Sequence, residues 1–376
     1  MFFKGTKSRP ESGQVNKDLD KIGADYNAFT TKESTGFWVK TSAKDFDAGL
    51  DIVSDILLEP LFKKEEMEKE KGVISQEIDM YEDNPKRKVQ TVLESVIFGD
   101  QPVGWDIAGD KKSVASIKRE DIINYEAENY LSGNMIVVVA GNFVKKDIFK
   151  KISSAFDPIK KGNRRKFAKT ETSQKEARVK IINKKTDQTH LALAIRAYDM
   201  YDKNRYALGL LSILLGGNSS SRLFMEIREK LGLAYYVYSW ADQLMDCGYL
   251  GIAAGIAHSN LETALEKIVS ICSKIKNGDI TQNDIDFAKS YLRGQTALRF
   301  EASDEIAHFV AGQELFYNKT EQPADILKRI EAVKREDVLN VAKELFKPKN
   351  FSLSVIGKHK DVEKINKFYK KILANI

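Results

Sequence analysis

The chain has 376 residues, of which 42% are hydrophobic and 30% are charged, and its formal net charge is +6. This composition is ordinary for a soluble globular protein, and the length suits two domains better than one. No apolar run approaches the roughly 18 residues that a membrane-spanning helix needs, which excludes a protein with transmembrane helices.

Cys247 and Cys272 are the only cysteines of the chain. Two thiols without a disulfide framework suit a reducing compartment, so we expect a cytoplasmic protein. Any N-terminal targeting signal would be missing if the chain begins inside a domain, as the repeat described below indicates.

Much of the net positive charge lies in residues 160–180, KKGNRRKFAKTETSQKEARVK. Because this segment is rich in Lys and Arg and poor in apolar residues, we interpret residues 159–175 as a basic linker. The alternative is a nucleic-acid site. Aromatic residues do not interleave with the basic ones and no binding motif accompanies them, so we expect no nucleic-acid partner.

Strands and helices alternate along the first half of the chain. The expected elements are a strand at 37–41, a helix with the apolar stripe Phe46, Leu50, Val53 and Leu57, a helix at 64–81, a short helix from Lys118 and a strand at 134–141. This order favours α+β domains, in which helices pack on one face of a sheet.

The same order returns in the second half. KREDIIN at 118–124 matches KREDVLN at 334–340, and NMIVVVAG at 134–141 matches NFSLSVIG at 350–357, both 216 residues later (334 less 118). A repeat this long indicates a duplicated domain and not a solenoid. We therefore predict two homologous domains, 1–158 and 176–376, each a mostly antiparallel sheet covered by helices.

The second copy is longer at its start than the first. It begins near Ala177 with two strand-like stretches and a helix over 206–215, whereas Met1 aligns only beside Gly216. Roughly 40 residues thus lack a counterpart, since a domain needs a complete sheet and its covering helix. We expect the first domain to be incomplete and the chain to be truncated. The alternative, a first copy that never had these strands, would leave a sheet edge uncovered.

Glu70 and Glu77 stand out within the predicted helix at 64–81. They are two turns apart and project from nearly the same side as Val73 and Ile74. Carboxylates on an apolar face are costly to bury unpaired, so a metal or another cation would explain them. The alternative is that both lie at the edge of the apolar stripe and reach water.

Several stretches together resemble the pitrilysin/insulinase (M16) family of zinc peptidases and the related mitochondrial processing peptidases. They are MFFKGTKSR at 1–9, NAFTTKEST at 27–35, the helix of Glu70 and Glu77, NMIVVVAGN at 134–142, and GGNSSSRLFMEIREKLGLAYYVYS at 216–239. The resemblance covers essentially the whole chain. It implies a LuxS/M16-like metallopeptidase fold and zinc-dependent hydrolysis of extended peptides.

The resemblance implies that Glu77 is a zinc ligand and that Glu70 supports the site, because MFFKGTKSR resembles the segment directly after the family's His-x-x-Glu-His motif. That motif, with two zinc ligands and the general base, is absent from this chain. The alignment also sets Gln295 opposite Glu77, so the second copy has no metal site. We therefore expect Zn²⁺ not to be retained and the chain to be inactive as it stands.

In the second half, the resemblance implies that Arg228 and Tyr235 orient the substrate backbone and stabilise the tetrahedral intermediate. The alternative is that Arg228 is an ordinary exposed charge and that Tyr235 is a strand residue facing the core. Asn27, Ala28 and Phe29 resemble the edge strand along which substrate lies by strand addition. Gly216 and Gly217 either cap the preceding helix or allow substrate to approach.

The predicted function is therefore that of a zinc endopeptidase of this family, inactive here for want of its motif. Half-length members resemble halves of larger enzymes, so we expect a homodimer or a heterodimer with a related subunit around a peptide or unfolded polypeptide. The competing class is a non-catalytic member that holds substrate for an active subunit.

Overall fold

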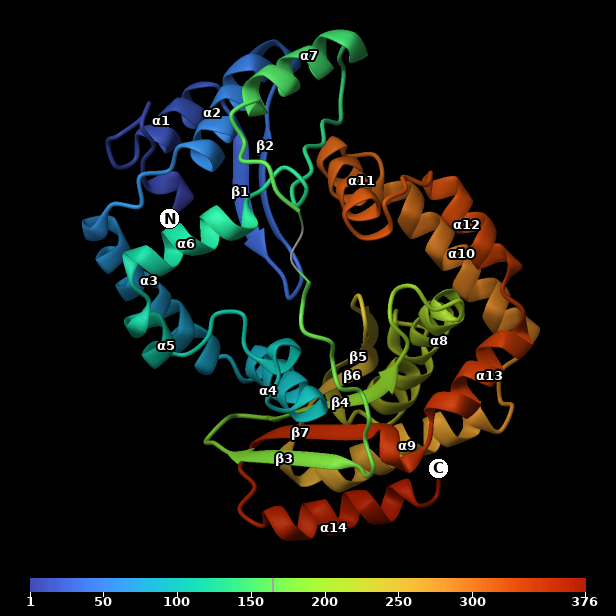
Figure 1. Ribbon diagram of the computed structural model, residues 1–376. Helices are drawn as coiled ribbons and strands as arrows, with labels where there is room; N and C mark the ends of the chain where they lie inside the picture. Colours follow the sequence, from blue (N-terminus) through green and yellow to red (C-terminus); the bar gives the residue numbers. More distant parts are fainter. Residues whose placement is uncertain (164–165) are drawn as a thin grey trace. The chain divides into compact units, whose positions relative to one another are not determined.

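The computed structural model describes residues 1–163 and 166–376 (Figure 1). The chain divides into two compact units. The first consists of Met1–Asp79, Ile107–Phe167 and Leu298–Glu321, and the second of Met80–Asp106, Ala168–Ala297 and Gln322–Ile376. No described helix is both long and apolar enough to cross a membrane.

The first unit is built around a two-stranded antiparallel sheet. Its elements are η1 (Phe2–Lys4), α1 (Gln14–Lys21), β1 (Asp25–Thr30), β2 (Thr35–Lys40), η2 (Ala43–Asp45), α2 (Phe46–Leu58), α3 (Lys64–Glu82, with its last three residues in the second unit), α5 (Lys111–Ser116), α6 (Arg119–Asn129), α7 (Lys145–Phe156) and α11 (Ser303–Tyr317). The core lies where α1, α2 and α7 meet the sheet, around Val15, Leu19, Ile52 and Ile56.

The second unit contains a five-stranded sheet in the order β3-β7-β4-β6-β5. Its strands are β3 (Arg178–Asn183), β4 (Thr189–Ala197), β5 (Ala234–Gln243), β6 (Gly248–Ile256) and β7 (Phe351–Gly357). Only the β3–β7 pairing is parallel, and the other three are antiparallel. The expected mostly antiparallel α+β fold is confirmed.

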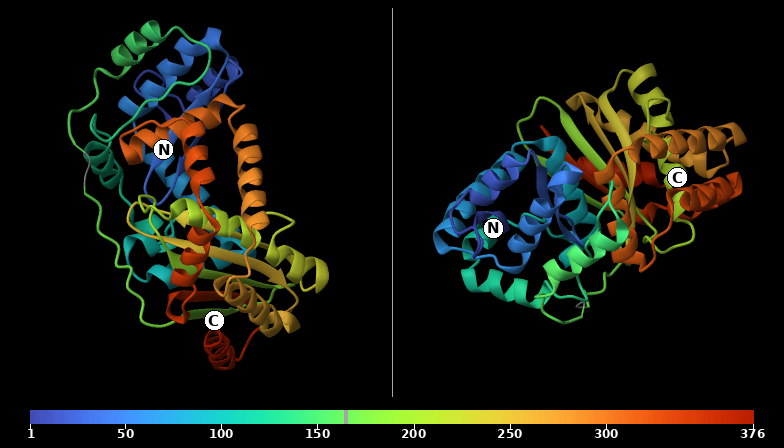
Figure 2. Two further views of the ribbon diagram at one scale, coloured as in Figure 1. Left: turned by 90° about the vertical axis from the view of Figure 1, so that its right-hand side faces the viewer. Right: turned by 90° about the horizontal axis from the view of Figure 1, so that it is seen from above.

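Helices cover both faces of this sheet (Figures 1 and 2). The helical elements of this unit are α4 (Pro85–Phe98), η3 (Pro102–Gly104), α8 (Arg205–Gly216), η4 (Phe224–Lys230), η5 (His258–Asn260), α9 (Leu261–Lys276), α10 (Gln282–Arg299, whose last two residues lie in the first unit), α12 (Pro323–Ala332), α13 (Arg335–Leu345), η6 (Pro348–Asn350) and α14 (Val362–Leu373). Cys247 and Cys272 are free and buried in this unit, as predicted for unpaired thiols.

The two faces of the sheet differ in side-chain size. Because successive residues of a strand point to opposite faces, Leu191, Leu193 and Ile195 of β4 pack toward α8 and α9 in the larger core. Ala192 and Ala194 face α4. The small side chains let α4 lie close to the sheet, and four of its buried residues fill that face (Val89, Leu93, Ile97 and Phe98).

The duplication is visible in matching hydrogen bonds. Arg119 Nε donates to the carbonyl oxygen of Phe62 at 2.7 Å, and Arg335 Nε donates to that of Ile280 at 2.5 Å. Each arginine opens the short helix that the repeated KRED box predicts. Both therefore tie this helix to the loop before the preceding long helix, which accounts for the repeated sequence.

Helices α4 and α11 are each assigned to the unit of the other repeat. Counted from Pro85 to Ser303, they stand 218 residues apart, close to the repeat length. Yet α4 packs on the sheet of the second unit, and α11 belongs to the first unit, where Asp304 accepts a hydrogen bond from Lys40 of β2 at 2.9 Å. The boundaries 1–158 and 176–376 describe the sequence repeats, and the compact units are assembled differently.

The strand expected at 134–141 is not formed. Asn134 Nδ2 donates to the carbonyl of Asn129 at 2.8 Å, as Asn350 Nδ2 does to that of Leu345 at 2.9 Å, so both segments start alike. In the second unit, β7 then pairs with β3 on one side and β4 on the other. Among the described residues of the first unit no strand corresponds to β3 or β4, and a strand without partners has no ladder to join.

Candidate functional site

Helix α3 carries Glu70 and Glu77, as the sequence predicted. Glu70 is 24% exposed and forms an ion pair with Lys4, with 3.1 Å between Nζ and Oε2. The Glu70 carboxylate also interacts electrostatically with the Met1 ammonium. Burial lowers the pKa of that ammonium, and the Glu70 carboxylate partly offsets the decrease. Glu77 is exposed. Glu70 thus has a cation as its partner, in the form of an amine.

The described residues do not fit a zinc centre by themselves. No group of three or more His, Cys, Asp or Glu side chains gathers among them in a way that could hold a metal ion. A catalytic zinc site takes three protein ligands and leaves a position for water. Glu77 could offer one carboxylate, and Glu70 is already paired with Lys4. The role of Glu77 as a ligand remains a prediction.

Strand β1 presents a free edge. Its partner is β2, and within the described chain these two strands make up the whole sheet. Thr31 N donates to the Ser34 carbonyl at 2.8 Å beside the hairpin turn. Because bonded and non-bonded pairs alternate in an antiparallel ladder, the backbone groups of Tyr26, Ala28 and Thr30 point away from β2.

The side chain of Asn27 lies on this free edge. Its Oδ1 atom accepts a hydrogen bond from the backbone N–H of Ala28 at 2.8 Å. This contact agrees with the outward direction of the Ala28 backbone, because an N–H that pointed at β2 would donate to a carbonyl group of that strand. The edge donor of Ala28 is therefore held by a neighbouring side chain that can rotate away.

Phe29 lies across the hairpin on the face of the sheet. A Cβ atom at Gly36 would come within 2.3 Å of its ring, so only glycine leaves room for the ring at that position. The His308 ring of α11 meets the Phe29 ring edge-on, with 5.5 Å between centroids, and the Trp38 ring at 6.2 Å. His308 was not a predicted site residue, and no spacing in the sequence relates it to Phe29.

Arg228 lies on η4, which is a π-helix. Its guanidinium stacks over the Phe224 ring at 4.8 Å from the centroid, and the side chain is exposed. Gly232, with φ of 60°, ends the turn that leads to β5. Single π-helical turns are frequent at functional sites because they re-aim side chains out of the regular helix.

Tyr235 is the extra residue of a β-bulge. Ala234 pairs with Ile256 and Tyr236 with Gly255, so the strand register shifts at this position and Tyr235 has no partner across the ladder. Its side chain is 68% exposed. The alternative of a core-facing strand residue is therefore wrong. Bulges turn one side chain out of the sheet, and they are common beside active sites.

Gly216 and Gly217 end α8, and each is required by close packing. A Cβ atom at Gly216 would lie 2.5 Å from the backbone nitrogen of Ser239 in β5, and one at Gly217 would lie 2.7 Å from Cα of Ile213. The glycine pair thus lets the end of α8 rest on the sheet. This observation favours the structural interpretation of the pair.

Comparison with protein families matches residues 1–111 to Insulinase (Peptidase family M16) and residues 116–292 to the Peptidase M16 inactive domain. An uncharacterized zinc protease of Streptomyces coelicolor is 32% identical over 368 residues, covering 96% of this chain and 80% of that protein. The chain belongs to the M16 peptidase family. A second uncharacterized zinc protease, from Bacillus subtilis, is 30% identical and covers 95% of this chain and 86% of its own length.

Solved M16-type structures share the fold. A protease from Helicobacter pylori superposes with a TM-score of 0.87 at 24% identity, covering 95% of this chain and 86% of that one. A peptidase M16 inactive domain from Pseudomonas fluorescens gives 0.88 at 20% identity, covering 96% and 86%. The resemblance inferred from the sequence is confirmed.

Proposed function

We propose that this protein binds extended polypeptides along the free edge of β1 and that its own residues hold the peptide without cleaving it. The observation that carries this proposal is the outward-facing backbone of Tyr26, Ala28 and Thr30 on an unpaired strand. An extended peptide can add to such an edge as a further strand, and its main-chain hydrogen bonds then supply affinity independent of sequence.

Asn27, Ala28 and Phe29 are the proposed substrate-binding residues. The backbone of Ala28 would exchange its bond with the Asn27 amide for one with the peptide. The Phe29 ring is 40% exposed and would pack against an apolar side chain of the bound strand. Apolar pockets beside an added strand provide selectivity, so this ring favours peptides with hydrophobic residues.

Arg228 and Tyr235 are the proposed polar anchors of the second unit. The Arg228 guanidinium lies over the face of Phe224 and forms no hydrogen bond or ion pair within the described structure, which leaves its N–H donors available. The exposed Tyr235 makes no hydrogen bond with another described residue. Both could donate to peptide carbonyl oxygens, and in a catalytically complete relative they would stabilise the oxyanion of the tetrahedral intermediate.

Zinc is the metal named in the relatives' descriptions, and Zn²⁺ chemistry there would supply an activated water molecule. We propose Glu77 as one ligand of such a centre and Glu70 as its supporting carboxylate. Because the described residues form no three-ligand group, this chain alone should not retain zinc. Peptide-bond hydrolysis is thus proposed only where further ligands complete the site.

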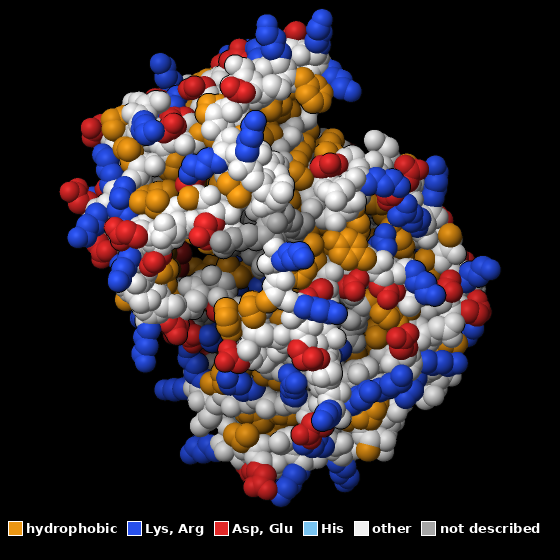
Figure 3. Space-filling model, in the orientation of Figure 1, with side chains coloured by type: hydrophobic (Ala, Val, Ile, Leu, Met, Phe, Trp, Pro, Cys, Tyr) orange, Lys and Arg blue, Asp and Glu red, His pale blue; other side chains and the backbone are white. Residues whose placement is uncertain are grey.

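In the second candidate function no zinc site is completed around Glu77. The protein is then a non-catalytic M16 member that holds substrate for an active related subunit. It is favoured by the same lack of a metal-binding group among the described residues. Either candidate accommodates a homodimer or a heterodimer, which light scattering on the purified protein would reveal. A basic nucleic-acid surface has less support, since Figure 3 shows acidic and basic side chains interspersed over the visible face.

The test combines binding and cleavage on one sample. Fluorescence anisotropy measures binding of a labelled, reduced and alkylated polypeptide, and a quenched peptide reports cleavage with added zinc or with a chelator. We expect saturable binding and no cleavage under either condition. Absence of binding would refute the proposal, and chelator-sensitive cleavage would show that the described residues do form a metal centre. Circular dichroism of the same sample separates a lack of binding from simple misfolding, and equilibrium dialysis measures whether zinc is bound.

A further inference from the structure

A hollow in the second unit lies apart from every residue assigned above. Its volume is about 590 Å³, and its lining includes Ser173 and Lys175, Arg196 of β4, Tyr198 just after that strand, and Glu344 and Lys349. Small-molecule sites commonly occupy about 300–1,000 Å³ and carry a few convergent polar groups. The size therefore suits an organic molecule larger than a single ion.

Arg196 is the buried charge of this hollow, with only 9% of its surface exposed. Its Nε donates to Gln174 Oε1 at 2.9 Å, and its Nη2 donates to the carbonyl oxygen of Ile97. The guanidinium also lies over the Phe98 ring at 5.6 Å. Nη1 makes no hydrogen bond with the described residues and is not among their buried unpaired atoms, so it reaches solvent in a residue that lines the hollow.

The partners of Arg196 are dipoles and not a carboxylate. Burial and then the nearby Arg178 lower the pKa of Arg196 to about 10, although Cys247 and Glu171 partly oppose this decrease. A guanidinium without a hydrogen-bonded carboxylate in a buried place leaves its charge incompletely compensated. An anionic ligand would supply the missing charge.

Capping of α4 does not account for this arrangement. The last carbonyl groups of α4 carry the negative end of the helix dipole and attract cations. Arg178 already serves them, since its Nη1 donates to the carbonyls of Val96 at 3.2 Å and Ile97 at 3.0 Å. A second guanidinium directed partly into a hollow of this size is not needed for a cap.

The rim adds positive charge. Lys175 and Lys349 are exposed at the hollow, and neither forms an ion pair within the described structure. The one acidic side chain in the lining, Glu344, accepts a hydrogen bond from the Tyr198 hydroxyl at 2.7 Å. Two lysines around a buried arginine attract anions, and the planar guanidinium matches the oxygen atoms of a carboxylate or a phosphate.

We propose that this hollow binds a small organic anion through its carboxylate or phosphate oxygen atoms, with Arg196 as the buried anchor and Lys175 and Lys349 at the rim. The site is separate from the proposed peptide-binding strand β1, which belongs to the first unit. Its occupancy therefore does not depend on whether the peptide proposal is correct.

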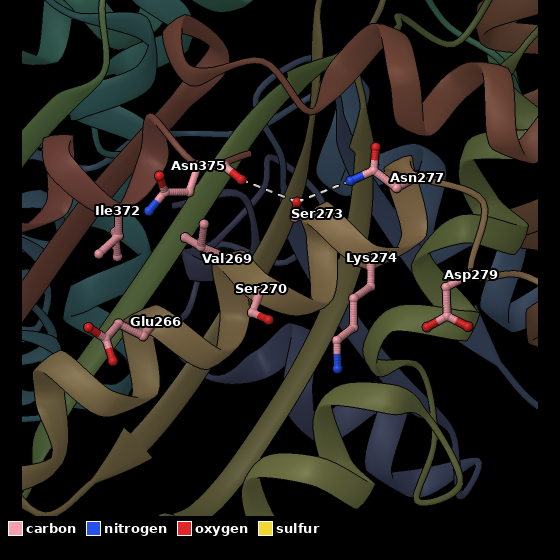
Figure 4. A pocket seen from close by; sticks show the side chains of 9 residues that line it. All are labelled: Glu266, Val269, Ser270, Ser273, Lys274, Asn277, Asp279, Ile372 and Asn375. Carbon is pink, nitrogen blue, oxygen red and sulfur yellow. Dashed lines mark hydrogen bonds between the residues drawn. The ribbon is translucent and has the colours of Figure 1, made fainter.

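A second hollow of the same unit provides a matched control. It lies between α9 and the end of the chain, has a volume of about 580 Å³, and is lined by residues that include Lys274, Ser273 and Asn375 (Figure 4). Ser273 donates to the Asn375 carbonyl at 3.3 Å. Among its lining residues there is no buried charged side chain, so this hollow has a lysine but no anchor.

The experiment uses isothermal titration calorimetry of the full chain at low, constant ionic strength, with inorganic phosphate, citrate and chloride as separate titrants. We expect saturable binding of phosphate or citrate and none of chloride. Phosphate binding would assign the oxygen atoms to a phosphate ligand, and citrate binding to a carboxylate. Failure of both to bind would overturn the proposal.

Charge reversal locates the binding site. Lys175→Glu and Lys349→Glu should each weaken binding of the active titrant about threefold to fivefold, because exposed charges act through water. Lys274→Glu, with the same change of net charge, should leave binding unaltered. Arg196→Gln should abolish binding, with circular dichroism checking the fold. Equal weakening by all three lysine variants would indicate non-specific attraction and would contradict the assignment.

Discussion

Replacing Arg9 by methionine tests how the first ten residues are fastened to α2. The Arg9 side chain is 14% exposed, and it donates to Asp18 at 2.9 Å, to Asp55 at 2.5 Å and to Asp51. Asp55 is 7% exposed and also accepts from the Thr6 hydroxyl at 2.6 Å. Burial opposes the charge of Arg9, but the hydrogen bonds of Asp51, Asp55 and Asp18 outweigh it and raise the pKa of the guanidinium.

The expected loss follows from the burial of the partners. Asp51 and Asp18 are 66% and 41% exposed, so their pairing with Arg9 contributes little. Arg9→Met leaves the Asp55 carboxylate buried with only Thr6 as its partner. Breaking a buried pair in this way costs about 3–5 kcal/mol, and since Arg9 is not fully buried we expect about 2–3 kcal/mol.

Lys7→Met is the matched control, because it removes the same charge from the same segment. Lys7 pairs with Glu59, and the two side chains are 69% and 41% exposed. Its loss should cost no more than about 0.5 kcal/mol. Adding Asp55→Asn to Arg9→Met should recover part of the stability, since the unpaired carboxylate is then gone.

Hydrogen exchange followed by mass spectrometry reads this effect locally. Peptides from α2 report the opening free energy of the first unit, independent of the second. The reasoning predicts faster exchange in α2 for Arg9→Met and unchanged exchange for Lys7→Met. Equal protection of α2 in both variants would refute the view that Arg9 carries a buried ion pair.

Three further changes test other parts of the structure. Ala28→Pro removes the outward N–H of β1 and should weaken polypeptide binding in anisotropy titrations about threefold to tenfold, whereas Ala28→Ser, which keeps the N–H, should not. Gly216→Ala forces a Cβ atom to within 2.5 Å of the Ser239 nitrogen and should lower the unfolding free energy by about 1–3 kcal/mol in urea titrations. Burial and then His258 lower the pKa of His359 from 6.5, so the unfolded state binds its proton first and stability falls as the pH drops below that value. The melting temperature should therefore decrease from pH 7 toward pH 5, and less so in His359→Gln, which can keep the bond to Thr189.

The duplication could be read from the sequence because it rests on short-range hydrogen bonds. The arginines of the two KRED boxes donate to loop carbonyl groups in the same way. The same local geometry requires the same residues, so the two sequences are alike at these positions. The strands β4 and β7 were predictable for a related reason. Large and small side chains alternate along both, and the two strands pair with each other within one unit.

Features that depend on partners were not predictable. Residues 134–141 have the composition of a strand, but a strand exists only where another one completes its hydrogen bonds. The stripe expected on α2 was right only in part. Leu57 is buried together with Ile52 and Ile56, whereas Phe46, Leu50 and Val53 are only partly buried. The bulge inserts one extra residue, Tyr235, into a strand, and the π-helix of Arg228 widens a helical turn. Neither irregularity changes the spacing of apolar residues in the sequence in a recognisable way.

The assignment of α4 to the second unit shows most clearly what sequence patterns cannot predict. The positions Val89, Leu93, Ile97 and Phe98 indicate a buried helix face, but nothing in them says which sheet it covers. In the structure that face lies on Ala192 and Ala194 of β4 and Ala253 of β6, two strands that come from the other repeat. Burying each large apolar side chain contributes about 1.5–3 kcal/mol, so the four together approach the roughly 5–15 kcal/mol net stability of a domain. The second unit therefore depends on a helix from the first repeat, and the linker between the repeats does not separate two independently stable halves.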